Sequence, residues 1–223
     1  HYHGTPFSPR ADLWLMGGKH FCVPFTDKRD TETCFRIGQS VMFDNGAFSL
    51  FTRGEKTNWG KFYDWVEPYI GHPHWVVVPD VIEGTPGENI ALAKKYPFRR
   101  DCACAVWHMD EPIGQVFKLM DMGFGKIAFG SSGKYWQVGS NSWCMRADEV
   151  WNALGKNGDL PWVHMMRGLS LGGKQWPFSS ADSTNVAVCG ASVNREYIAR
   201  QIDAAQTPVK WVQRGEQTSL LEN

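Results

Sequence analysis

The chain lacks an excess of either charge, because its 223 residues contain 23 Lys and Arg against 23 Asp and Glu. A formal net charge of zero gives no overall attraction to nucleic acid or to membranes, so contact with phosphates would require a local basic patch. No apolar run approaches the roughly 20 residues of a membrane span, and no signal peptide is expected. These absences predict a cytoplasmic globular protein without a membrane partner.

Two common motifs for nucleotides and metals are also missing. No G-x-G-x-x-G follows an early apolar run, which counts against a dinucleotide-binding fold, and we expect no cofactor. The six cysteines are dispersed without a C-x-x-C pair, as in reduced cytoplasmic proteins. Cys102 and Cys104 would face the same side of a strand, where two small buried residues explain the pair as well as a metal does. We therefore expect no metal site.

Eight short apolar runs are present, and helical or loop segments separate them. Most are continuously apolar rather than alternating, which is typical of parallel strands covered on both faces. The predicted strands are Tyr2–Thr5, His20–Phe25, Ser40–Asp44, Trp75–Asp80, Cys102–His108, Lys126–Ser131, Trp162–Gly168 and Pro177–Asp182.

The connections between these runs predict helices. The clearest has Thr85 as its N-cap and Pro86 at the first helical position. Amphipathic helices are expected at Pro9–Gly17, Asn58–Tyr69, Pro86–Tyr96, Ile113–Met122, Arg146–Leu154 and Asn194–Ala205. Segment 26–39 is polar and irregular, and segment 169–176 is too short for a good helix. Residues 1–223 are therefore expected to form one compact (β/α)8 TIM-like barrel with some degenerate helices, with an open doubly wound sheet as the alternative.

Polar residues follow the predicted strands at the end where a barrel places its active site. They are His3, Asp44, Asp80, His108, Ser131, Arg167 and Asp182. Three aspartates, each directly after an apolar run, are more than turn chemistry alone predicts, although tight turns remain the alternative. After Asp44, Gly46 would let a flat ligand approach and Phe48 would stack on it.

Six segments, in order between Ser40 and Asn185, carry a resemblance to a known family. They are "FDNGAFSLF", "VVVPDV", "AVWH", "KIAFGSSG", "VHMMRGL" and "FSSADST". The first resembles a D-S-G-G-[YF]-Q segment, and the last resembles a D-x-F-D-[CS] segment, of the tRNA-guanine transglycosylase (queuine tRNA-ribosyltransferase) superfamily. The resemblance covers most of the expected barrel.

The resemblance implies base exchange by double displacement through an aspartyl-sugar intermediate. Asp182 would be the nucleophile and Asp44 the acid/base group. Asp80 would bind guanine, because an ionised carboxylate accepts both the N1–H and N2–H donors of that base. The remaining pocket residues would be Phe48, His108 in place of the family's glutamine, backbone groups around Phe129 and Gly130, and Met165 or Met166. His108 and the two methionines could instead be ordinary core residues.

The chain departs from the tRNA-modifying members, which are longer and carry a zinc site of three Cys and one His. No such pattern follows Asp182, so no separate zinc-binding domain is expected. The chain is similar to the short, divergent branch associated with 7-deazaguanine modification of DNA in phages and mobile elements. This resemblance implies two partners, a nucleic acid and a 7-deazaguanine base such as preQ0. The nucleic acid would be DNA rather than tRNA. A homodimer or a larger modification complex is compatible with it, in the host cytoplasm if the protein is phage-encoded.

Other functions remain open at this point. An N-glycosidase or a nucleoside deoxyribosyltransferase would use the same two carboxylates on a small substrate, and a tRNA-guanine transglycosylase would use them on tRNA. A non-catalytic nucleic-acid-binding barrel within a larger complex is a further alternative, against which the three aspartates argue. The sequence does not define the incoming base, the target strand or the oligomeric state.

Overall fold

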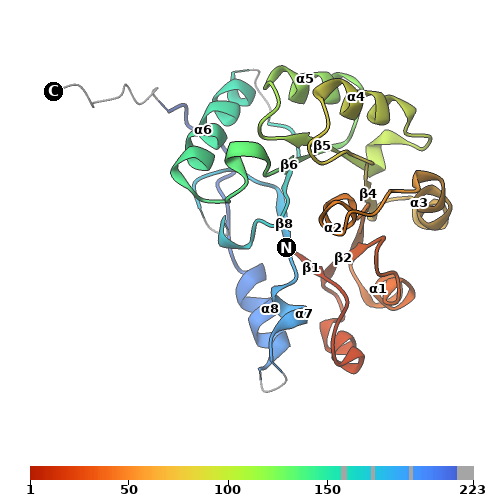
Figure 1. The fold of residues 1–223 in the computed structure, drawn as a ribbon. Coiled ribbons are helices and arrows are strands. Elements are labelled where there is room, and N and C mark those ends of the chain that lie inside the picture. Colours follow the sequence, from red (N-terminus) through yellow and green to blue (C-terminus); the bar gives the residue numbers. More distant parts are fainter. Residues whose placement is uncertain (157–159, 172–173, 191–192, 215–223) are drawn as a thin grey trace.

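Eight parallel strands close into a barrel in the computed structural model, which describes residues 1–156, 160–171, 174–190 and 193–214 (Figure 1). Each strand pairs with the next, and β8 returns to pair with β1. The strands are β1 (Tyr2–Gly4), β2 (His20–Pro24), β3 (Ser40–Asp44), β4 (Trp75–Val77), β5 (Ala103–His108), β6 (Lys126–Gly130), β7 (Val163–Met165) and β8 (Ser180–Ser183). Each of the eight apolar runs supplies one strand, so the predicted barrel is confirmed and the open sheet is wrong.

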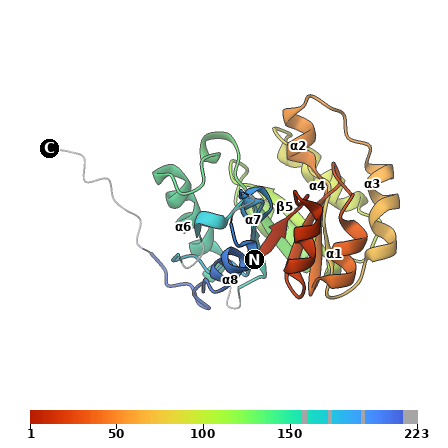
Figure 2. The same ribbon diagram turned by 90° about the horizontal axis from the view of Figure 1, so that it is seen from below.

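Helices surround the ring of strands, and several are short, as expected for a degenerate barrel (Figure 1). Figure 2 shows α2 lying above α1 and α3 when the barrel is turned by 90°. The α-helices are α1 (Thr31–Ile37), α2 (Ala47–Thr52), α3 (Trp59–Val66), α4 (Pro86–Lys95), α5 (Gly114–Asp121), α6 (Asn141–Gly155), α7 (Asn185–Val188) and α8 (Arg195–Asp203). The 3-10 helices are η1 (Arg10–Met16), η2 (Glu67–Tyr69), η3 (Arg100–Cys102), η4 (Gly133–Tyr135) and η5 (Leu169–Leu171). Residues 172 and 173 of the weak 169–176 connection lie outside the described residues.

Helices α1 and α6 differ from the sequence-based expectation for identifiable reasons. The polar segment 26–39 contains α1, which buries Cys34 and is tied to the preceding connection through Asp30. Asp30 accepts hydrogen bonds from the backbone of Phe7 and from Arg10, so tertiary contacts override the weak local pattern. Helix α6 begins five residues before the predicted Arg146, because the Ser140 side chain caps it by accepting from the backbone N–H of Trp143.

Alternation along the strands divides the buried residues into two layers. One small cluster fills the barrel interior: Tyr2, Cys22, Met42, Trp75, Val77, Cys104, Val106 and Ala128. A larger cluster packs between the outer face of the sheet and the helices. Because successive side chains of a strand point to opposite faces, the residue next to an interior one faces the helices. This rule decides which strand-end residues reach the cavity described below. Within the described ranges, no helix is long and apolar enough to cross a membrane.

Candidate active site

A cavity of about 780 Å³ opens at the carboxyl ends of the strands, among the loops that follow them. Asp44, Asp80 and Asp182 all line it, although they come from β3, the loop after β4, and β8. The other sequence-predicted residues that line this cavity are Phe48, His108, Gly130, Ser131, Met166 and Arg167. The fold therefore gathers most of the candidate residues around one space, the exceptions being His3, Phe129 and Met165.

Asp44 is the last residue of β3 and sits beside the turn that starts α2. Burial, reinforced by the negative charge of Asp182, raises the pKa of Asp44 to about 7. At neutral pH the carboxyl group therefore carries a proton in a large fraction of molecules. Gly46 follows with φ of 74°, and a Cβ there would lie 2.9 Å from Thr26 Cγ2. The turn and its contact with Thr26 therefore require glycine at this position.

Asp182 lies on β8 and is anchored through one oxygen. Its Oδ1 accepts a hydrogen bond from His164 Nε2 at 3.1 Å and another from the backbone N–H of Arg167 at 2.8 Å. His164 is completely buried inside the barrel on β7. The sequence analysis did not single it out. Its signal was a lone histidine inside an apolar strand, and the pairing of β7 with β8 was needed to connect it with Asp182.

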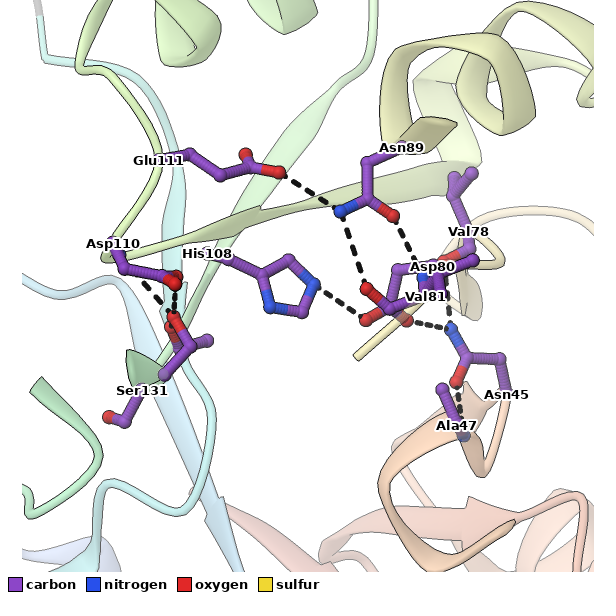
Figure 3. Close-up of polar contacts among 12 residues, drawn as sticks. Asn45, Ala47, Val78, Asp80, Val81, Asn89, His108, Asp110, Glu111 and Ser131 are labelled. Carbon is purple, nitrogen blue, oxygen red and sulfur yellow. Dashed lines mark hydrogen bonds and ion pairs between the residues drawn. The ribbon is translucent and has the colours of Figure 1, made fainter. Parts of the chain in front are cut away.

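Asp80 is held by two side chains, as Figure 3 shows. Asn45 Nδ2 donates to Asp80 Oδ1 at 2.7 Å, and His108 Nε2 lies 2.9 Å from Asp80 Oδ2. Asn45 also donates to the Val78 carbonyl and accepts from the backbone N–H of Ala47, so it fixes the turn after Asp44. Burial lowers the pKa of His108, but the hydrogen bond and charge of Asp80 outweigh it and leave that pKa raised.

A second polar layer supports the loop that carries Asp80 (Figure 3). Asn89, buried on α4, donates to Glu111 Oε1 at 2.9 Å and accepts from the backbone N–H of Val81 at 2.8 Å. Burial raises the pKa of Glu111. Sequence reasoning missed this layer, for which the signal was an asparagine on the buried face of an otherwise ordinary helix.

Phe48 lies on α2 at the mouth of the cavity, where 47% of its surface is exposed. The Arg167 guanidinium lies 4.4 Å from the centroid of its ring and covers one face by a cation–π contact. The expectation that Phe48 stacks on a base therefore applies to the face that Arg167 leaves free.

Two predicted pocket residues, Phe129 and Met165, do not line this cavity. Both are fully buried in the outer core, on the helix side of the sheet. The reason is strand alternation, because the neighbours Gly130 and Met166 face inward and line the cavity instead. The Phe129 ring packs against the rings of Trp107, Trp151 and Phe178. Of each predicted pair, Phe129–Gly130 and Met165–Met166, only the second residue lines this cavity.

His3 was also grouped with the strand-end polar residues, and the same rule removes it. Its neighbour Tyr2 faces the barrel interior, so His3 points outward, where its Nε2 lies 3.0 Å from Asp203 of α8. This pair belongs to the contact between β1 and α8 rather than to the cavity.

The cysteines do not form a metal group in the cavity. Cys104 lies in the barrel interior, whereas Cys102 lies before β5, beside His72 and Asp101. Potential ligand atoms of these last three residues lie within 4.8 Å of one another, the one such trio in the described part of the chain. They sit at the opposite end of the barrel from the cavity, and the side chain of Arg99 already binds both oxygens of Asp101.

Comparisons with protein-family models, curated proteins and solved structures found no match. The transglycosylase resemblance therefore stays a prediction, and a functional assignment must be argued from the geometry of the cavity.

Proposed function

We propose that this protein is a transglycosylase that exchanges guanine in nucleic acid, preferably DNA, for a 7-deazaguanine base such as preQ0. The observation that carries the proposal is the pair of carboxyl groups, Asp44 and Asp182, in one cavity. Asp44, with a pKa of about 7, can give and take a proton near neutral pH. Asp182 accepts two N–H bonds, an arrangement that suits an ionised nucleophile.

The two groups divide the exchange into two balanced steps. First, an oxygen of Asp182 bonds to C1′ of the sugar as the C1′–N9 bond breaks, and the leaving base takes the proton of Asp44. Next, N9 of the incoming base attacks C1′ and gives its proton to Asp44, and Asp182 leaves as a carboxylate. Each step inverts C1′, so the product keeps its anomeric configuration.

The Asp80 carboxylate retains the capacity to recognise the base. Each of its oxygens has two lone-pair directions, and Asn45 and His108 occupy one each. The other two could accept N1–H and N2–H of guanine, donors that 7-deazaguanines also carry. His108 Nδ1 lies on the Gly130 side of the ring, 3.9 Å from where a Cβ of Gly130 would be. When the ring is charged, this nitrogen also carries a proton, which it could donate to the O6 atom of the base.

Trapping the intermediate tests the proposal. Wild type is incubated with a guanine-containing DNA oligonucleotide, denatured, and analysed for a covalent protein–DNA species by gel and intact mass. The species is expected in wild type and absent in Asp182→Asn, while both proteins bind guanine equally. Full exchange activity in Asp182→Asn would refute the assignment.

One feature favours a second candidate, a nucleoside deoxyribosyltransferase or N-glycosidase acting on a small substrate. The cavity lining mixes Arg53 and Arg167 with Asp27, Glu83 and Asp110, which is not a continuous basic track for phosphates. Comparing a free deoxynucleoside, a DNA oligonucleotide and a tRNA in the same assay separates these substrates. A non-catalytic barrel would form an adduct with none of them.

A further inference from the structure

The two oxygens of the Asp182 carboxylate are in different environments. Oδ1 accepts from His164 Nε2 at 3.1 Å and from the backbone N–H of Arg167 at 2.8 Å. Among the described residues, Oδ2 has no hydrogen-bond partner, and Asp182 lines the cavity. The carboxylate is thus fixed by one oxygen and leaves the other available.

The His164 ring cannot turn away from this contact. It stacks parallel to the Trp162 ring, with 6.2 Å between centroids and an interplanar angle of 5°. The rings of Trp75 and Tyr2 meet it edge-on at 5.2 Å and 5.9 Å. Its second nitrogen, Nδ1, lies 2.7 Å from Ser180 Oγ. Three aromatic rings and one hydroxyl therefore hold Nε2 toward Asp182.

Hydrogen-bond chemistry assigns the proton within this chain of contacts. An ionised carboxylate only accepts, so the proton between Asp182 and His164 lies on Nε2. Nδ1 of a neutral ring is then an acceptor, and the Ser180 hydroxyl donates to it. Ser180 thus selects the tautomer that presents an N–H to Asp182.

The second donor comes from an unusual backbone conformation. Arg167 has a φ of 58°, in the left-handed region that non-glycine residues rarely adopt. The next residue, Gly168, is pressed against the sheet, since a Cβ there would lie 2.8 Å from Met165 Cγ and 2.9 Å from Ala181 Cβ. Strained backbone of this kind is found where surrounding structure requires it, and here it directs an N–H at Oδ1 of Asp182.

We propose that His164, with the backbone N–H of Arg167, positions the nucleophile: it anchors Oδ1 of Asp182 and leaves Oδ2 to attack C1′. The inference rests on the proposed function. When Oδ2 bonds to C1′, Oδ1 becomes the carbonyl oxygen of the ester and still accepts both hydrogen bonds. The donors therefore stay paired through both steps and stabilise the carboxylate as it leaves.

The test compares two substitutions of His164 with a matched control. His164→Gln can keep an N–H donor near the position of Nε2, whereas His164→Leu removes it. His20 is the control, because it also lies in the barrel and bonds a serine, Ser40 at 2.7 Å, but does not contact Asp182. The measured quantities are folding by circular dichroism, the rate of adduct formation with the guanine-containing oligonucleotide, and kcat and KM for guanine exchange.

His164→Leu is expected to fold, to form adduct about 10–100-fold more slowly, and to keep its KM for guanine, because charged hydrogen bonds have this magnitude and Asp80 binds the base. His164→Gln should recover most of the rate, and His20→Leu should match wild type. A folded His164→Leu with the wild-type rate would overturn the inference while leaving the proposed function intact. Should His164→Leu not fold, Ser180→Ala replaces it, and an unchanged adduct rate in that variant would overturn the inference.

A readout that needs no turnover separates the two proposals further. Ring ¹⁵N spectra of histidine-labelled protein, with His164 assigned from His164→Gln, should show a proton on Nε2 of this ring. Asp182→Ala should change this signal and leave that of His20 in place. A His164 ring protonated at Nδ1 alone would refute the positioning role, even if no substrate is found.

Discussion

Asp44→Asn is expected to make the protein more stable and less active. The pKa of Asp44 is raised from 3.8 to about 7, so ionising this group is harder in the folded state than in the unfolded chain. The difference corresponds to about 4 kcal/mol of unfolding free energy, to order of magnitude. An asparagine cannot ionise and escapes this penalty.

The sign of the pH dependence follows from the direction of the shift. Because the folded pKa is raised, the stabilising contribution is full below pH 3.8 and is lost as pH rises through about 7. Wild type should therefore lose stability relative to Asp44→Asn between these values, and the difference should level off above them. Urea unfolding of both proteins at several pH values measures this difference.

Asp27→Asn provides a control, because its effect on stability should change with pH in the opposite direction to that of Asp44→Asn. The hydrogen bond from Arg29 lowers the pKa of Asp27, so the native carboxylate adds stability as pH rises, and Asp27→Asn should lack this gain. In single-turnover assays, wild-type adduct formation should fall above about pH 7 as Asp44 loses its proton, and Asp44→Asn should be nearly inactive with guanine as leaving base. Parallel stability profiles for wild type and Asp44→Asn from pH 4 to 8 would refute the assignment of a protonated Asp44.

The remaining predictions concern base binding by Asp80 and the different positions of Met165 and Met166. Asp80→Asn should weaken guanine binding by about 2–4 kcal/mol, because one charged acceptor is lost and one donor is mismatched; unchanged affinity in a calorimetric titration would remove Asp80 from base recognition. Met165→Ala should cost about 2–5 kcal/mol of stability by opening a cavity in the outer core, without affecting base binding. Met166→Ala should change the KM for the base instead, and the reverse pattern in paired unfolding and kinetic assays would contradict the strand alternation described here.

The barrel could be predicted from the sequence because each strand comes from a short, continuous apolar run. Such a run can be recognised from a few consecutive residues, without knowledge of distant contacts. The three aspartates could be placed together because parallel strands of a barrel end on one face. The sequence did not separate Phe129 from Gly130 or Met165 from Met166, because that choice depends on counting strand alternation from the interior residues. Helix α1 was missed because its stability comes from Asp30 and its partners in another connection, which no local pattern contains.

The partner residues behind the aspartates were harder to predict. The contact of His164 with Asp182 depends on the register between β7 and β8, and that of Asn45 with Asp80 on the loop after β4. Such contacts join residues 18 and 35 positions apart. Pattern and propensity describe a segment and its neighbours, so they do not determine these distances.

Asn45 has a consequence for any attempt to evolve a new base preference. It follows Asp44 directly in the chain, and its side-chain amide donates hydrogen bonds to both Asp80 and the Val78 carbonyl. A substitution at Asn45 that changes the surroundings of Asp80 would also displace Asp44, the proposed acid/base group. Selection for a different base should therefore tolerate changes at His108 better, because these leave the turn after β3 intact. Libraries that vary His108 and Asp110, which line the cavity, should yield more active variants than libraries that vary the Asp44-Asn45-Gly46 turn.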